Sequence, residues 1–195
     1  SFNNAFNSIK GAVFGYPDPL LTSEIINSIP YASSMLKIGK GSNGLIILES
    51  VSNSKYTWVS KDQVHIVVEE GRIIKTVGLF NNLTNLIRPD LSFEDLVNKA
   101  NASKNYFFYY SYDKPFLSDL RMSVSLVNKG IEKVEILGKT RNLLLLEETI
   151  SNEKIRWEKK NLFWIDPLDH YVWKSIQHIS PKLPPFTLQV TKRPQ

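Results

Sequence analysis

Short runs of mixed apolar and polar residues, separated by turn residues, dominate the chain from Ser33 onward. Gly-Ser-Asn-Gly at 41–44, Lys-Asp at 61–62 and Glu-Gly at 70–71 separate the first runs, and such breaks are typical of β-hairpins. Further runs of strand length are 105–112, 120–127, 133–139, 142–150, 154–159, 161–166, 171–179 and 186–192. Many short strands at regular spacing favour a barrel or a sandwich. The pattern therefore predicts a mainly β, antiparallel, barrel-like fold of about ten to twelve strands.

Three segments instead show helical spacing. Near the start, apolar residues recur on one side of a helix at Phe2, Phe6, Ile9 and Val13. Thr22 or Ser23 can cap a second short helix that Pro30 ends. Ser92, with Asp95 three residues on, starts a helix over about 92–102. We expect residues 1–32 to form a helical tether, residues 33–195 to form a single β domain, and helix 92–102 to cover an end or edge of the barrel.

The strand-rich part of the sequence contains an internal similarity. Residues 38–79 align without a gap on residues 137–178, and 12 of the 42 pairs are identical, including Trp58 with Trp157 and Lys75 with Lys174. Coincidence is the alternative interpretation. The favoured one is a duplicated five-strand unit at about 36–80 and 135–179, because one such sheet cannot bury its face and cover its edges alone. The barrel would then be built from two such units, with the two tryptophans in equivalent places.

Composition narrows the function classes. At 195 residues the chain can bury one sizeable core. The net charge of +5 is modest, and Lys and Arg are spread along the chain, so nucleic-acid binding is disfavoured. The sequence contains no cysteine, which excludes disulfides, thiolate metal sites and a cysteine nucleophile.

Residues capable of catalysis show no useful pattern. The three histidines, His65, His170 and His178, lack metal-ligand spacing. The acidic pairs at 69–70 and 147–148 are adjacent, and neighbours on a strand point to opposite faces. We therefore expect no catalytic residues, no metal, no cofactor and no enzyme activity.

Aromatic residues and two lysines are the candidate ligand-binding groups. Sugar rings stack on aromatic faces, and the aromatic run at 106–112 and the repeated tryptophans supply such faces, although core packing is the simpler interpretation. Lys75 is expected to share a strand face with Ile73 and Val77, and Lys174 is expected to share one with Val172 and Ile176. Each lysine therefore either binds an anionic group inside the barrel or extends past apolar neighbours into water. The candidate binding residues are Lys75, Lys174, Tyr106, Tyr109, Tyr110, Trp58 and Trp157.

The sequence resembles the YjbF-like outer-membrane lipoproteins of group 4 capsule and exopolysaccharide operons. The resemblance runs from about Leu21 to Val190, through Trp58, Gly71-Arg72, 76–79 and the strand that starts at Lys174. It implies a barrel-like fold and a lipid-modified cysteine at the mature N-terminus. Since this sequence has no cysteine, we expect the anchor to lie outside it.

The resemblance also implies a function. We expect a non-enzymatic component of capsule or exopolysaccharide assembly or export, held at the outer membrane with its domain in the periplasm. It would bind the polysaccharide or a protein of the secretion machinery. The alternatives are a glycan-modifying enzyme of the same pathway and a lipid carrier with a half-open barrel. A cleft with paired carboxylates would favour the enzyme, and a deep apolar cavity would favour the carrier.

Overall fold

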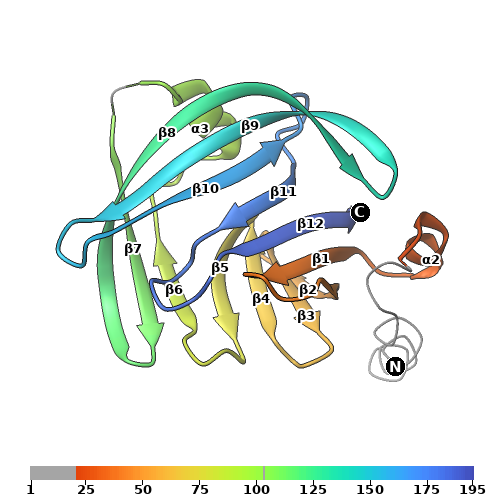
Figure 1. The fold of residues 1–195 in the computed structure, drawn as a ribbon, viewed down its shortest axis with the longest axis horizontal. Coiled ribbons are helices and arrows are strands. Elements are labelled where there is room, and N and C mark those ends of the chain that lie inside the picture. The colour runs from red at the N-terminus through yellow and green to blue at the C-terminus, as the bar shows by residue number, and fades with distance from the viewer. Residues whose placement is uncertain (1–20, 103) are drawn as a thin grey trace.

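The computed structural model describes residues 21–102 and 104–195. It contains two short helices and twelve strands in this part of the chain (Figure 1). In chain order they are α2 (Ser23–Ser28), β1 (Ser33–Ile38), β2 (Gly44–Ser52), β3 (Lys55–Ser60), β4 (His65–Glu69), β5 (Arg72–Val77), β6 (Leu83–Ile87), α3 (Phe93–Lys99), β7 (Tyr106–Asp113), β8 (Phe116–Ile136), β9 (Lys139–Asn152), β10 (Trp157–Ile165), β11 (Val172–Gln177) and β12 (Phe186–Lys192).

All twelve strands belong to one antiparallel sheet with the order β5-β4-β3-β2-β1-β12-β11-β10-β9-β8-β7-β6. The sheet curls until its two edge strands, β5 and β6, lie against each other, which gives a nearly closed barrel. No backbone ladder joins these edges. Instead, the Leu83 amide donates to Thr76 Oγ1 at 3.0 Å, and the Leu79 amide donates to Asn82 Oδ1 at 3.0 Å. The predicted fold class, an antiparallel β-barrel of ten to twelve strands with short helices, is confirmed.

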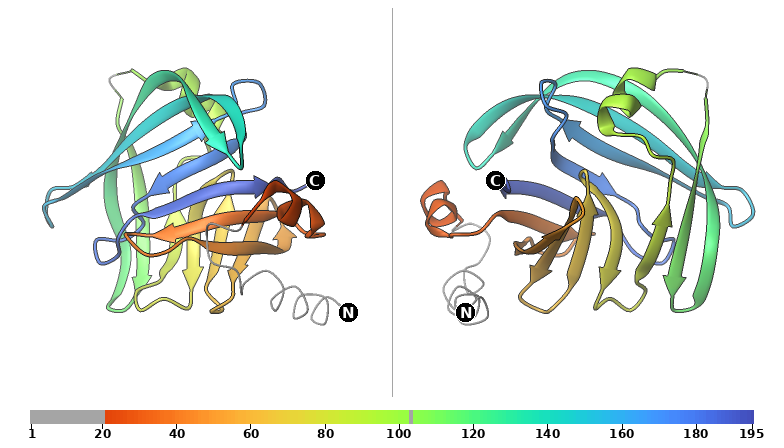
Figure 2. Two further views of the ribbon diagram at one scale, coloured as in Figure 1. Left: turned by 45° about the vertical axis from the view of Figure 1, so that its right-hand side comes forward. Right: turned by 180° about the vertical axis from the view of Figure 1, so that it is seen from behind.

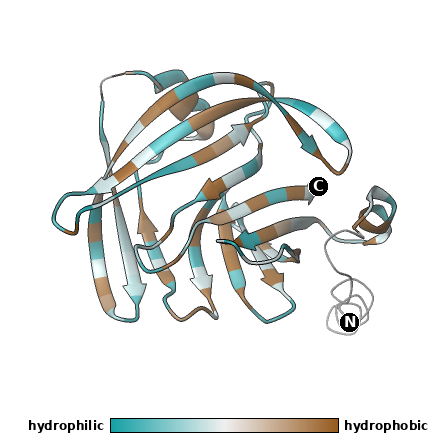
Figure 3. Cartoon of the chain, in the orientation of Figure 1, coloured by the Kyte–Doolittle hydropathy of each residue, from teal (hydrophilic) through white to brown (hydrophobic). Residues whose placement is uncertain are grey.

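The barrel interior contains the main hydrophobic core. Apolar and polar residues alternate along most strands, because successive side chains point into the barrel and out of it (Figure 3). Strand β7 shows the alternation clearly. Tyr106, Phe108 and Tyr110 are buried, while Phe107 is exposed and Tyr109 is half-buried. The aromatic run is therefore buried on one face only.

Helix α2 packs on the outside of the sheet. Thr22 caps it by accepting a hydrogen bond from the Ile25 amide, as the sequence predicted, and Ile26 and Ile29 pack against Leu45 of β2. Lys192, the last residue of β12, donates from Nζ to the carbonyl of Ile29. The helix predicted near the start of the chain lies outside the described residues.

Helix α3 covers one end of the barrel (Figures 1 and 2). Its capping box is formed as the sequence predicted, since Ser92 accepts from the Asp95 amide while the Asp95 carboxylate accepts from the Ser92 amide. Phe93 and Leu96 enter the main core. Because β6 and β7, which flank the helix, pair directly with each other, the helix does not connect two separate half-sheets.

Strands β8 and β9 are long and continue beyond the barrel wall as an arm, which we define as residues 130–142 (Figures 1 and 2). The arm begins at an irregularity between Asn128 and Ile131, where the pairing of the two strands shifts. Its apolar residues Val134 and Ile136 pack in a second cluster with Trp164 and Trp173. The tip of the arm also accepts a hydrogen bond from Ser23 of α2, at the Leu137 carbonyl, so helix and arm support each other.

The duplicated five-strand unit is not confirmed. Residues 55–60 and 65–69 form two strands, β3 and β4, whereas the aligned residues 154–168 contribute a turn, the single strand β10 and a loop. The hairpin registers differ as well. Trp58 pairs with Leu48 in mid-strand and is buried in the core, while Trp157 pairs with Asn152 beside its turn and is half-buried.

Gly71, in the β4–β5 turn, offers a test of how closely opposite walls approach. Its φ is +83°, and a Cβ added there would lie 2.4 Å from the Cβ of Val172 on β11. We predict that Gly71→Ala lowers the free energy of unfolding by about 2–5 kcal/mol, from backbone strain plus the forced displacement of β11. Urea unfolding followed by circular dichroism measures the change.

Gly138→Ala is the matched control, because Gly138 also has a positive φ, +72°, but a Cβ there meets no atom within 4 Å. This variant should lower the free energy of unfolding by only about 1–2 kcal/mol, because only the strain of the left-handed backbone is added. Equal losses for the two variants would contradict the close wall-to-wall contact at Gly71.

Candidate functional site

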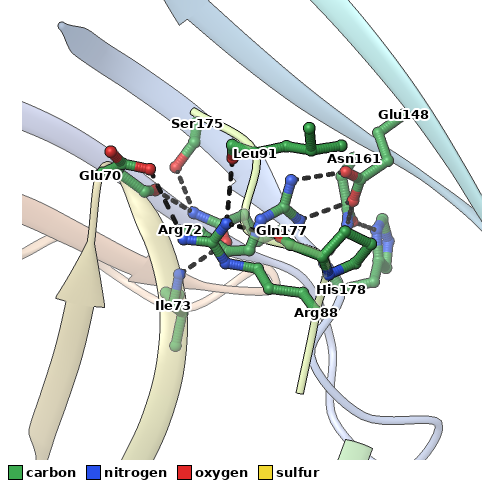
Figure 4. Close-up of polar contacts among 12 residues, drawn as sticks. Glu70, Arg72, Ile73, Arg88, Leu91, Glu148, Asn161, Ser175, Gln177 and His178 are labelled. Atoms are coloured by element: carbon green, nitrogen blue, oxygen red, sulfur yellow. Dashed lines mark hydrogen bonds and ion pairs between the residues drawn. The ribbon is translucent and has the colours of Figure 1, made fainter. Parts of the chain in front are cut away.

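A buried ion pair crosses the barrel interior. Arg72 of β5 donates from Nη1 to Glu148 Oε1 at 2.9 Å and from Nη2 to Oε2 at 2.6 Å, and Glu148 lies on β9 (Figure 4). The two residues are 2% and 0% exposed. Two parallel hydrogen bonds between a guanidinium and a carboxylate are the strongest and most directional form of such a pair. The bond therefore fixes the distance between two well-separated strands of the sheet.

Aromatic rings surround the arginine. Its Cζ lies 4.9 Å from the centroid of the Phe163 ring, 5.0 Å from Phe108 and 5.7 Å from Phe93. Burial alone would lower the pKa of Arg72, but the Glu148 carboxylate outweighs it and the pKa is raised. Arg72 thus remains a cation whose charge is neutralised inside the core. Burial, together with the Glu148 charge, likewise raises the pKa of Tyr110 beside this pair, so the phenol stays neutral.

Two amide side chains extend the polar network. Asn161 donates to Glu148 Oε1 at 2.9 Å and accepts from the His178 amide at 2.7 Å. On β11, Gln177 accepts from the Ile73 amide at 2.9 Å and donates to the Gly71 carbonyl at 2.8 Å (Figure 4). Strands β5 and β11 are far apart in the sheet order, so Gln177 attaches the β4–β5 turn to the opposite wall.

A pocket of about 440 Å³ opens at one end of the barrel, and we call it the mouth pocket. Its walls come from the β2–β3 and β4–β5 turns, the start of α3, the β10–β11 loop with β11, and the ends of β1 and β12. Its size falls in the range of small-molecule sites. The aromatic residues in its lining are Tyr56, Trp58, Phe93, Tyr171 and Trp173.

Charged groups in the mouth pocket are divided between its walls. Glu70 and Glu94 lie on the side of the β4–β5 turn and α3, whereas Lys174 and Arg193 lie on the side of β11 and β12. Asp169, also in the lining, is paired with Arg193, and the hydrogen bond from that arginine lowers the pKa of Asp169. The carboxylate is therefore ionised at neutral pH and its charge is already compensated.

The structure brings only two of the seven predicted binding residues, Trp58 and Lys174, into the mouth pocket. Tyr110 is buried beside Arg72, and Trp157 packs half-buried against the core. Tyr106 and Tyr109 line a shallow depression at residues 87–89 and 105–109. The candidate list from the sequence left out Tyr171 and Trp173, which lie at the end of the β10–β11 loop and the start of β11 and could have been found as aromatic residues bordering a loop.

Lys75 lies on the outer surface of β5. The β4–β5 pairing skips Ile74, because Val68 pairs with Ile73 and Val67 pairs with Lys75. This irregularity reverses the alternation, so Ile73 is 1% exposed while Lys75 and Val77 face solvent. The prediction that Ile73 and Lys75 share one face was therefore wrong, and the lysine has the water-facing position of the simpler interpretation.

The predicted opposite orientation of adjacent glutamates is correct for Glu147 and Glu148. Glu148 points into the core, and Glu147 accepts from Lys160 at 2.9 Å on the outer surface. Within residues 21–102 and 104–195, no cluster of three His, Asp or Glu side chains has the geometry of a metal site. The helices in the same residues are too short and too polar to span a bilayer.

Sequence comparison identifies the family. The profile described as "Group 4 capsule polysaccharide lipoprotein gfcB, YjbF" matches residues 6–191, nearly the whole chain. The chain belongs to the YjbF family.

Two curated YjbF-family relatives come from Escherichia coli K12. The lipoprotein GfcB is 24% identical over 191 residues, which cover 95% of this chain and 87% of GfcB. The lipoprotein YjbF is 26% identical over 163 residues, which cover 82% of this chain and 75% of YjbF. A crystal structure of the hypothetical lipoprotein YmcC from E. coli K12 has the same fold, with a TM-score of 0.74, 24% identity and 90% coverage of both chains. The predicted family is thus confirmed.

The burial of the ion pair leads to a prediction about the stability of the fold. Glu148→Ala leaves the Arg72 cation inside the core without its partner, so we predict a loss of about 3–5 kcal/mol in the free energy of unfolding, measured by urea denaturation. Glu147→Ala, at the adjacent outward position, is the matched control. It breaks only the exposed pair with Lys160 and should cost about 0–1 kcal/mol. Similar small losses for both variants would show that the pair does not stabilise the barrel.

Proposed function

We propose that this chain is a non-enzymatic lipoprotein component of capsule or exopolysaccharide assembly or export that binds a segment of the polysaccharide in its mouth pocket. The family supports the pathway and the lipoprotein class. The relatives' lipoprotein names also support attachment to a membrane. We further propose that the membrane is the outer membrane and that the domain lies in the periplasm.

The mouth pocket is the observation that carries this proposal. The planes of Tyr171 and Trp173 meet edge to face at 77°, with centroids 5.2 Å apart, so the buried Trp173 supports the half-buried ring of Tyr171 in the pocket wall. Such faces stack on the apolar sides of sugar rings, and the charged and hydroxyl groups around them can bind sugar hydroxyls. Tyr56 supplies a further aromatic face from β3.

The other functions find less support in the same geometry. Side chains from opposite walls meet around Arg72 and fill the middle of the barrel, which leaves little room for the long apolar cavity that a lipid carrier requires. Of the three carboxylates in the pocket wall, Asp169 is paired with Arg193, and Glu70 lies 3.5 Å from Arg88. This pairing disfavours an acid–base couple for glycan cleavage.

A binding experiment tests the proposal. Size-fractionated oligosaccharides from the polymer of the producing strain are titrated into the purified domain, with calorimetry as the readout. We predict that Tyr171→Ala weakens binding at least fivefold, about 1 kcal/mol, because a stacking face is lost. The matched control is Tyr109→Ala, which removes another half-buried tyrosine outside the mouth pocket and should leave affinity unchanged.

Two results would contradict the proposal. If no fragment binds, or if both tyrosine variants bind like the unmodified domain, the mouth pocket is not a glycan site. If chromatography of the incubated fragments reveals shorter products, the protein is an enzyme. Capture of the lipid-anchored protein from cells that make the polymer, followed by sugar analysis, would show whether the same glycan is bound in the cell.

A further inference from the structure

Four buried side-chain polar atoms have no hydrogen-bond partner in the described part of the chain: Arg88 Nε, Tyr106 OH, Arg141 Nε and Trp173 Nε1. Two of them occur together. The Arg141 guanidinium stacks on the Trp173 ring, with Cζ 3.6 Å from the ring centroid, and Trp173 lines the mouth pocket. An unmade hydrogen bond at a buried N–H is costly, so such groups in native proteins commonly have a functional explanation.

The neighbouring tryptophan shows which partner this environment can accommodate. Trp164, in the same apolar cluster beneath the arm, donates from Nε1 to the Glu132 carboxylate at 2.9 Å. Lys174 lies over the Trp164 ring, with Nζ 4.9 Å from the centroid. Trp164 therefore combines a stacked cation with a carboxylate acceptor. Trp173 has the stacked cation, Arg141, but no acceptor from the described chain.

Cations are concentrated on this side of the mouth pocket. Arg193 stacks on Tyr171 with Cζ 3.9 Å from the ring centroid, and Lys174 belongs to the same wall. Stacking on an aromatic face holds a cation in place without neutralising it. Because Arg193 is already paired with Asp169, Lys174 and Arg141 supply the positive charge that a negatively charged group entering beside Trp173 would meet.

We propose that the mouth pocket selects an acidic sugar, and that the carboxylate of that sugar is bound by Trp173 Nε1, Arg141 and Lys174. This inference rests on the proposed function and specifies its ligand. The two unpartnered nitrogens are covered by side chains in the free protein. Arg141 lies on the arm, and binding therefore requires its side chain to move away from the edge of Trp173. The acidic side chains Glu70 and Glu94 on the opposite wall repel a carboxylate, so the sugar enters in one orientation.

The test compares an acidic probe with its neutral counterpart. Oligogalacturonate and the same oligosaccharide after reduction of its carboxyl groups are titrated into the purified domain, alongside fragments of the producing strain's polymer. We expect the acidic probe to bind at least tenfold more tightly than the reduced one, a difference of about 1.4 kcal/mol. Trp173→Phe keeps the ring and removes the N–H, and Arg141→Gln removes the charge. Each should abolish most of this preference.

Matched lysine variants complete the experiment. Lys174→Met should reduce affinity for the acidic probe, while Lys75→Met, the same change on the outer surface of β5, should not. Equal affinity for acidic and reduced probes, failure of the acidic probe to bind, or a full preference retained in Trp173→Phe and Arg141→Gln would overturn the inference. Binding of the strain's own fragments in those cases would leave the proposed function standing, and loss of all binding would remove both.

Discussion

The bidentate contact between Arg72 and Glu148 is the constraint on which the rest of the structure depends. It joins two strands of one sheet through the interior. In a wider barrel these side chains would not meet, and water or a ligand would have to fill the space between them. Burying two charges is expensive, and the cost is recovered only if both oxygens and both nitrogens of the pair are satisfied. The two parallel hydrogen bonds of the pair and the Asn161 amide meet that requirement, and phenylalanine rings surround the guanidinium. The middle of the barrel is consequently filled, and open volume remains at its mouth.

Much of the architecture could be predicted from local sequence patterns. The alternation of apolar and polar residues predicted most of the strands, and Ser92 with Asp95 predicted the start of α3. Both signals depend only on residues that are close in the sequence. The ion pair could not be predicted this way, since its partners are separated by 76 positions and each is ordinary in its own strand. The face predicted to be shared by Ile73 and Lys75 was wrong for a related reason. A single extra residue in β5 reverses the alternation, and the shift is visible only in the pairing with β4. The apparent repeat shows that twelve identities can coincide with different hairpin registers.

Most residues of the mouth pocket come from turns, a loop and the ends of strands, with Trp58 in mid-strand, whereas Glu148 of the ion pair lies well inside β9. Family members at 24–26% identity can therefore keep the barrel and its closure while the surface around the pocket changes. The residues that line the pocket can vary while the barrel is kept, because turns tolerate substitution better than a packed interior. The long arm formed by β8 and β9 adds a further packed element beside this surface without altering the barrel wall.

The C-terminal strand connects the end of α2 with the wall of the mouth pocket. Lys192 of β12 is hydrogen-bonded to the end of α2, and the next residue, Arg193, stacks on Tyr171 in the pocket wall. Tension applied to the chain before α2 would thus be passed through one residue to the aromatic surface of the mouth pocket. Under the proposed function, a lipid anchor ahead of α2 and a polymer held in the mouth pocket would pull on opposite ends of this connection. The strength of polymer binding would then depend on the tension between them.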